Sequence, residues 1–203
     1  MNPYPAKFLE LYDQLPDDGL AVDLGCGPAR PDTGQLVQLV NVDLAPAADL
    51  PRGLAGDVGR YNGVPLGSGT VDLVLSAAVL EHVPDPTRHL AEAARILKPG
   101  GLLYVDGASM QPLHRVPGHY FGVYPDGLAL LLDRTGFDVV EAGTSGRLAD
   151  QVTWIRDMAD PEGIGGDWWT QLGMALAALY ELPGVQSVLA TGTWAVARKR
   201  VTR

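Results

Sequence analysis

The residues VDLGCGP at positions 22–28 join a short apolar run to a glycine turn. The run over 20–24 is apolar apart from Asp23 and stops at Gly25, a pattern typical of a buried parallel strand. Glycines after such a strand let the backbone approach a nucleotide-like ligand without a clash at Cβ. The stretch therefore predicts the first strand of an open α/β sheet with a binding loop at its carboxyl end.

Strand-like and helix-like runs alternate on both sides of this loop. Further buried strands are predicted at 39–43, 71–75, 102–105 and 137–140, and helices over 6–15, 85–97 and 126–135. This alternation predicts a doubly wound, Rossmann-like, mostly parallel sheet with right-handed crossovers. The run at 193–197 is expected to return as a final antiparallel strand, after a helical insertion.

The 203 residues suit a single domain over 1–203, with an N-terminal helix region at 1–19 and a Trp-rich helical insertion at 144–191. The insertion is a candidate lid, and a dimer contact or a satellite core explains its apolar residues equally well. We therefore expect a monomer or a homodimer.

The composition limits which cellular compartment and which binding partners we expect for this protein. The formal charge of −9 opposes phosphate backbones, so nucleic acid is a disfavoured partner. The single cysteine, Cys26, permits no internal disulfide and fits a reducing compartment. No signal peptide is evident, and the most apolar stretch, 172–190, is interrupted by Glu181 and Pro183. We expect a cytoplasmic protein without a membrane partner.

Asp43 ends the second predicted strand, close to the offset at which a carboxylate accepts both hydroxyls of a ribose. A dinucleotide site would prefer a third glycine where this chain has Arg30, and a helix that Pro28 and Pro31 interrupt. A ligand without phosphates needs no such helix. S-adenosylmethionine is a ligand of that kind.

Four blocks of sequence resemble the class I S-adenosylmethionine-dependent methyltransferases, in the subgroup of small stand-alone methyltransferase-domain proteins. The blocks are VDLGCGP (22–28), NVDLAP (41–46), GD (56–57) leading to VDLVLSAAVLEHVPDP (71–86), and LKPGGLLYVDG (97–107). They occur in the order and the approximate spacing of that family. The segment that joins the first strand to Asp43 is shorter than is common there.

The resemblance implies a role for nine residues toward S-adenosyl-L-methionine, whose product after transfer is S-adenosyl-L-homocysteine. The residues implied around its methionine part are Asp23, Gly25, Cys26 and Gly27. The residues implied around its adenosine are Asp43 at the ribose hydroxyls, Leu44 on the adenine face, Asp57 at the adenine amino group and Val58 through its amide. Ala77 is implied near the methyl group.

The segment 114–124 is the candidate source of catalytic groups, because it follows a strand that ends at the binding edge. A neutral histidine is a competent base, so His114 and His119 are candidates, with Tyr120 beside them. Alignment and desolvation supply much of the catalysis of methyl transfer, so a dedicated base is not required. No carboxylate spacing accompanies these histidines, and no metal is expected.

Other polar and aromatic residues are candidates for contact with the methyl acceptor. They are His82, which with Glu81 also suits a purely structural helix start, and Tyr124, Trp154 and Trp168. His89 is expected on an outward face of its helix. The leading hypothesis is methyl transfer to oxygen or nitrogen of a small organic acceptor. The alternatives are a cofactor-binding regulatory module without turnover and, more weakly, an NAD(P)-dependent oxidoreductase.

Overall fold

The computed structural model describes residues 4–27, 39–43, 53–55, 63–114, 118–160, 166–183 and 185–201. Its strands are β1 (Ala21–Leu24), β2 (Leu39–Asp43), β3 (Gly53–Ala55), β4 (Val71–Ser76), β5 (Leu97–Ala108), β6 (Phe137–Ser145) and β7 (Gly192–Lys199). Its helices are α1 (Ala6–Tyr12), the 3-10 turn η1 (Leu80–His82), α2 (Pro86–Ile96), α3 (Pro125–Arg134), α4 (Leu148–Ala159), α5 (Trp168–Tyr180) and α6 (Val185–Val188).

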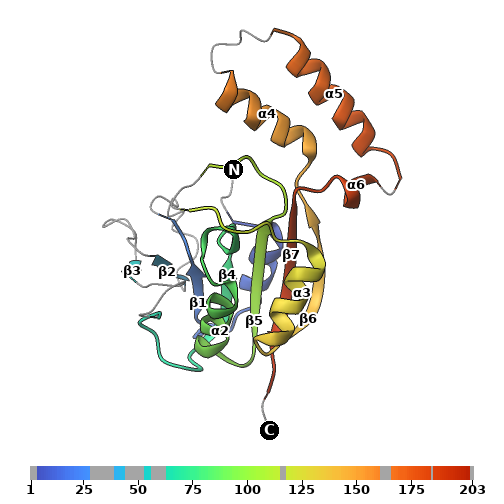
Figure 1. Cartoon of the computed structure of the whole chain (residues 1–203). Coiled ribbons are helices and arrows are strands. Elements are labelled where there is room, and N and C mark those ends of the chain that lie inside the picture. The colour runs from blue at the N-terminus through green and yellow to red at the C-terminus, as the bar shows by residue number, and fades with distance from the viewer. Residues whose placement is uncertain are drawn as a thin grey trace.

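The described strands form one seven-stranded sheet in the order β3-β2-β1-β4-β5-β7-β6 (Figure 1). The pairs from β3 to β5 are parallel, and β7 runs antiparallel between β5 and β6. The predicted mostly parallel, doubly wound sheet with a final antiparallel strand is confirmed. The strand order reverses between β1 and β4, which is where ligands bind in sheets of this kind.

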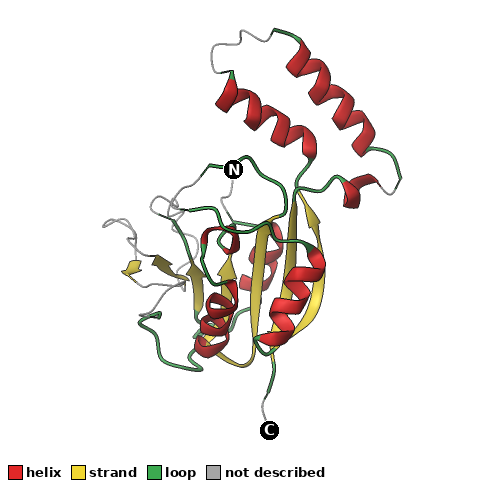
Figure 2. Ribbon diagram, in the orientation of Figure 1, coloured by secondary structure: helices red, strands yellow, loops and turns green. Residues whose placement is uncertain are grey.

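Two apolar clusters fill the two faces of the sheet, because successive side chains of each strand point to opposite sides. Val22, Val74 and Leu103 belong to the cluster that includes buried residues of α2 and α3. Ala21, Leu75 and Tyr104 belong to the other cluster, which Phe8 and Tyr12 of α1 complete. Figure 2 shows the resulting helix–sheet–helix layering around the sheet.

Helix α2 begins with a cap that its sequence supplies. The carboxylate of Asp85 accepts the amide of Arg88 at 3.0 Å, and Pro86 occupies the first turn, where its missing N–H costs nothing. The helix ends at Ile96, and the chain enters β5 at Leu97, earlier than the strand predicted at 102–105. A register shift between β4 and β5 absorbs the extra residues.

His89 corrects the expectation of an outward-facing histidine. Its side chain is fully buried on α2, and its Nε2 lies 2.8 Å from the hydroxyl of Ser76 at the end of β4. His89 stands four residues before Ala93 and seven before Ile96, and both of these are buried. This spacing places all three side chains on the inward stripe of the helix.

Helices α4 and α5 form a hairpin between β6 and β7 that projects beyond the sheet (Figures 1 and 2). Because β6 extends to Ser145, the segment outside the sheet starts at 146, and β7 resumes at Gly192. Val152 is the buried side chain of α4, whereas no residue of α5 is buried. Among the described helices, none combines the length and apolar character that crossing a bilayer requires.

Candidate functional site

The glycine loop after β1 closes over the end of β2. The amides of Gly25 and Cys26 donate to the carbonyl of Val42 at 2.8 and 3.3 Å. The carboxylate of Asp43 accepts the amide of Gly27 at 2.8 Å. The loop and the acid that the sequence assigned to one ligand therefore lie together at the carboxyl edge of the sheet.

Two glycines of this loop have positive φ for different reasons. Gly25 has φ 91°, and a Cβ there would lie 2.5 Å from a methyl carbon of Val79. Gly27 has φ 73°, and no atom of the described residues lies within 4 Å of a Cβ built there. Gly25 thus packs the loop against the segment after β4, while Gly27 lies beside Asp43 with no described residue against its Cβ position. This arrangement fits a ligand cradled by loop backbone.

The segment after β4 passes directly beside the glycine loop. Ala78 has φ 54°, an uncommon conformation for a residue with a side chain, and its amide donates to the carboxylate of Asp106 at 2.8 Å. Burial, reinforced by the charge of Asp106 and a hydrogen bond to it, raises the pKa of the Tyr104 phenol well above its usual value of 10.0. Asp106, on β5, therefore contacts both the segment after β4, through Ala78, and the phenol of Tyr104. Ala77, the residue implied near the methyl group, precedes this strained position.

Three histidines gather where η1 meets the loop after β5. The ring centroid of His114 lies 4.9 Å from that of His82 and 5.0 Å from that of His119, and His82 and His119 are 5.7 Å apart. The Nε2 atoms of His82 and His114 are 3.2 Å apart. Trp154 of α4 lies on the same cluster, with its ring 5.2 Å from His114. We call these four side chains the histidine cluster.

Unsatisfied polar atoms accompany this cluster. Glu81 is fully buried, and neither of its carboxylate oxygens has a hydrogen-bond partner; the buried Nδ1 of His119 has none either. The loop after β5 contacts η1 at this point, where the amide of Tyr120 donates to the carbonyl of Glu81 at 2.7 Å. Buried polar groups are nearly always hydrogen-bonded, so each of these exceptions calls for a specific explanation, of which a catalytic role is one. Sequence reasoning left Glu81, together with His82, open between a substrate contact and a structural helix start.

The remaining predicted site residues fall into three groups. Tyr120, Tyr124 and Trp168 are about half exposed; Tyr124 precedes α3, and Trp168 stacks on Trp169 with ring centroids 3.8 Å apart. Asp23 and Cys26 are buried beside the loop. Leu44, Asp57 and Val58 lie outside the described residues.

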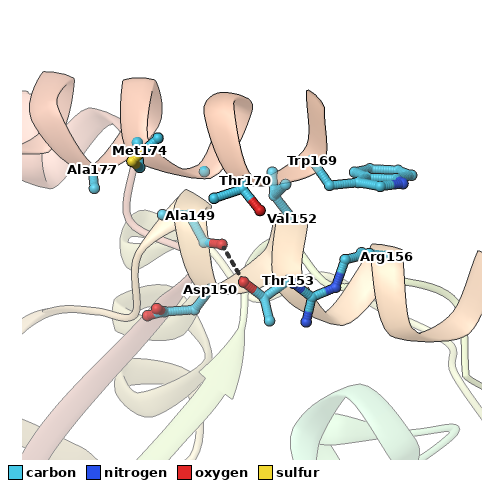
Figure 3. Close-up of a pocket in the computed structure, with 10 residues that line it drawn as sticks. Ala149, Asp150, Val152, Thr153, Arg156, Trp169, Thr170, Met174 and Ala177 are labelled. Carbon is cyan, nitrogen blue, oxygen red and sulfur yellow. Dashed lines mark hydrogen bonds between the residues drawn. The ribbon is translucent and has the colours of Figure 1, made fainter. Parts of the chain in front are cut away.

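A cavity of about 280 Å³ lies between α4 and α5 (Figure 3). Figure 3 shows Val152, Thr153 and Arg156 of α4 facing Trp169, Thr170 and Met174 of α5. The hairpin is thus incompletely packed along its own seam. No group of three or more metal-ligating side chains suited to a metal ion occurs within the described parts of the chain.

The fold resembles those of solved S-adenosylmethionine-dependent methyltransferases. The structure superposes on that of a putative methyltransferase from Bacillus halodurans with a TM-score of 0.61 and 16% identity, over 97% of this chain and 98% of that one. The cyclase SpnF matches equally well, with a TM-score of 0.61 and 20% identity over 97% and 81%. These likenesses concern the fold, which hosts more than one reaction.

The sequence comparison adds the family. Residues 22–105 match the family described as Methyltransferase domain. A dimethylglycine N-methyltransferase from Parasynechococcus marenigrum is 32% identical over 108 residues, 46% of this chain and 39% of that protein. The chain matches between 33% and 45% of the length of the first curated relatives.

Proposed function

We propose that this protein binds S-adenosylmethionine in the crevice beside β1 and β4 and transfers its methyl group to oxygen or nitrogen of a small organic acceptor. The observation that carries the proposal is the hydrogen bond from the Gly27 amide to Asp43, which joins the glycine loop to the acid at the end of β2. When bound, the cofactor supplies a methyl group on a positively charged sulfur. The chain's own task is to hold this group in line with the acceptor and to exclude water.

The cofactor roles follow the position of each residue at the carboxyl edge. Backbone of Gly25, Cys26 and Gly27 would hold the methionine part, with Asp23 at its amino group. Asp43 would accept the ribose hydroxyls from the position where it also orders the loop. Leu44, Asp57 and Val58 would surround the adenine, and Ala77 would lie near the methyl group.

The acceptor side would be the histidine cluster. His82, His114 and His119 present ring nitrogens beside the segment after β4, and Trp154 supplies an apolar wall. Tyr120, Tyr124 and Trp168 are exposed enough to contact an acceptor at the rim. A net charge of −9 favours a small molecule over a nucleic acid.

Binding of the cofactor product is the first test. Calorimetry with S-adenosylhomocysteine should show binding by wild-type protein, and Asp43→Asn should weaken it by about 1–3 kcal/mol, since charge-assisted hydrogen bonds are lost. The matched control is Asp133→Asn, which removes an exposed partner of Arg200 far along the chain and should keep wild-type affinity. Wild-type protein that binds neither form of the cofactor would contradict the proposal.

Turnover is the second test, and it separates an enzyme from a binding module. Protein incubated with methyl-labelled cofactor and small-molecule extract should move label into the small-molecule fraction. The Asp43→Asn variant serves as the control and should transfer less label at subsaturating cofactor. Tight cofactor binding with no transfer to any extract would support the regulatory alternative instead.

A further inference from the structure

The rings of His82 and His114 take part in three hydrogen-bond contacts, two to backbone carbonyls and one to each other. His82 Nδ1 is bonded to the carbonyl of Gly118, and His114 Nδ1 lies 3.0 Å from the carbonyl of Pro112. The third contact joins the two Nε2 atoms at 3.2 Å. Carbonyl oxygens only accept, so each Nδ1 must carry a proton.

Two neutral imidazoles cannot supply these three bonds. A neutral ring carries one N–H, and here both are used at Nδ1, so both Nε2 atoms would present bare lone pairs to each other. One additional proton between the Nε2 atoms replaces this repulsion with a charge-assisted N–H···N bond. The hydrogen-bond pattern is complete only when the two rings together hold three protons.

We propose that His82 and His114 act as one proton-binding site, which takes up the proton that the methyl acceptor loses. This role rests on the proposed methyl transfer. As the acceptor heteroatom bonds to the methyl carbon, the carbon–sulfur bond breaks with its electron pair left on sulfur, which becomes a neutral thioether. The proton of the acceptor passes to the lone pairs between the two Nε2 atoms, and the base is the pair in its two-proton state.

The position of the pair suits this role. Val79, three residues before His82, is the residue that Gly25 of the cofactor loop contacts. The turn η1 therefore begins at the proposed cofactor site and ends at the proton site. Both rings are only partly buried, so an acceptor can approach them.

Among the described residues, few titratable or charged groups surround the pair. His119 is the third titratable ring, and the carboxylate of Glu81 lies on the side of η1 toward β5, where its Oε2 is 3.5 Å from the position of a Cβ on Gly107. On the loop side, the described titratable group is the phenol of Tyr120, which is half exposed. Helix α4 presents the uncharged Trp154, and its charged residues pair with neighbours: Arg147 with Asp150, and Arg156 with Asp157.

Nitrogen-15 spectra of histidine-labelled protein test the shared proton without any turnover. The chain has four histidines, so His82→Gln, His89→Gln, His114→Gln and His119→Gln assign every signal. In the wild type, the Nδ1 atoms of His82 and His114 should both be protonated, and their Nε2 signals should move together through one transition on titration. Removing either ring should end this joint movement, because the remaining ring then has no partner with which to share the third proton.

The control and the contradicting results are distinct. His119→Gln removes a ring that is bonded to neither partner and should leave the joint transition in place. Circular dichroism checks that each variant folds, and the two single variants of the pair test the coupling from both sides. Independent transitions for His82 and His114, or a bare Nδ1 on either ring, would overturn the shared proton.

Proton uptake from the acceptor, the catalytic part of this proposal, is tested by a separate measurement. The methylation rate should rise with pH through the same transition that the spectra show, and His114→Gln should shift that profile. A methylation rate that does not change through the transition would contradict proton uptake by the pair, but it would not contradict the proposed methyl transfer. A protein that binds cofactor but methylates nothing would remove the proposed function and the acceptor role together, and the spectra would still decide the shared proton.

Discussion

Gly25 and Gly27 share a left-handed backbone conformation, but they face different surroundings. The Cβ position of Gly25 is filled by Val79, whereas no described residue lies within 4 Å of that of Gly27. A residue with a side chain pays about 1–2 kcal/mol for this conformation at either position. Only at Gly25 does a steric clash add to that cost.

Alanine at each glycine should therefore separate packing from ligand binding. We expect Gly25→Ala to lower the free energy of unfolding more than Gly27→Ala, by a further 1–3 kcal/mol or so, the usual range for overpacking. Gly27→Ala should instead weaken S-adenosylhomocysteine binding out of proportion to its effect on stability. Urea unfolding and calorimetry measure the two effects. Equal destabilisation by both variants would mean that Val79 does not confine the loop.

Helix α2 anchors the segment before β4 through one ion pair. Glu92 accepts the amide of Val64 at 2.6 Å and Arg95 at 2.7 Å, and Arg95 donates to the carbonyls of Val64 and Leu66. The Glu92 side chain is 15% exposed. The hydrogen bond from Arg95, followed by that from Val64, holds the pKa of Glu92 below its usual 4.5 against the effect of burial. The helix thus fixes the chain that enters the central strand.

Glu92→Gln should destabilise the protein by about 1–2 kcal/mol at neutral pH, because charged hydrogen bonds are weakened. The pKa of Glu92 is lowered on folding, so its stabilisation is present above the unfolded value of 4.5 and is lost as pH falls through the folded value. The difference between wild type and variant should therefore shrink below about pH 4.5. Urea unfolding across pH measures it.

The control for this prediction is Glu10→Gln, which removes an exposed partner of Lys7 on α1. Exposed ion pairs contribute little, so its effect should stay within about 0.5 kcal/mol at any pH. A Glu92→Gln effect that does not depend on pH would show that the carboxylate charge is not what anchors the segment.

At the scale of the whole molecule, the described residues of the α4–α5 hairpin contact the body mainly near its base. Trp154 contacts His114, the amide of Gln151 lies 3.4 Å from the hydroxyl of Thr191, and the Tyr180 hydroxyl lies 3.4 Å from the carbonyl of Gly146. No side chain of α5 is buried. The hairpin is therefore attached at its base and through one aromatic contact at the proposed acceptor site.

Trp154→Ala should affect the acceptor rather than the cofactor. We expect the acceptor KM to rise about tenfold, the equivalent of about 1.4 kcal/mol, while affinity for S-adenosylhomocysteine stays the same. Met158→Ala is the matched control, since Met158 is half exposed on the same helix. Equal effects of both substitutions would indicate that the hairpin acts through its general stability and not through Trp154.

Much of the fold was predictable because it depends on local patterns. The strands at 39–43 and 71–76, the cap at Asp85 and the glycine turn at 25–27 all follow from residue order and backbone preference. His89 was assigned to the wrong face, although its spacing to Ala93 placed it on the inward stripe. The length of β5 was missed because its first residues pair through a register shift that involves β4.

The sequence by itself determined the sheet class and the loop with its acid, since alternating burial and glycine conformations are properties of short segments. The tertiary structure alone decided the histidine cluster, the buried Glu81 and the position of Trp154 over His114. His82 and His114 are 32 residues apart and meet only because β5 and its loop return the chain to η1. Contacts of this kind depend on how elements pack, which no local pattern specifies.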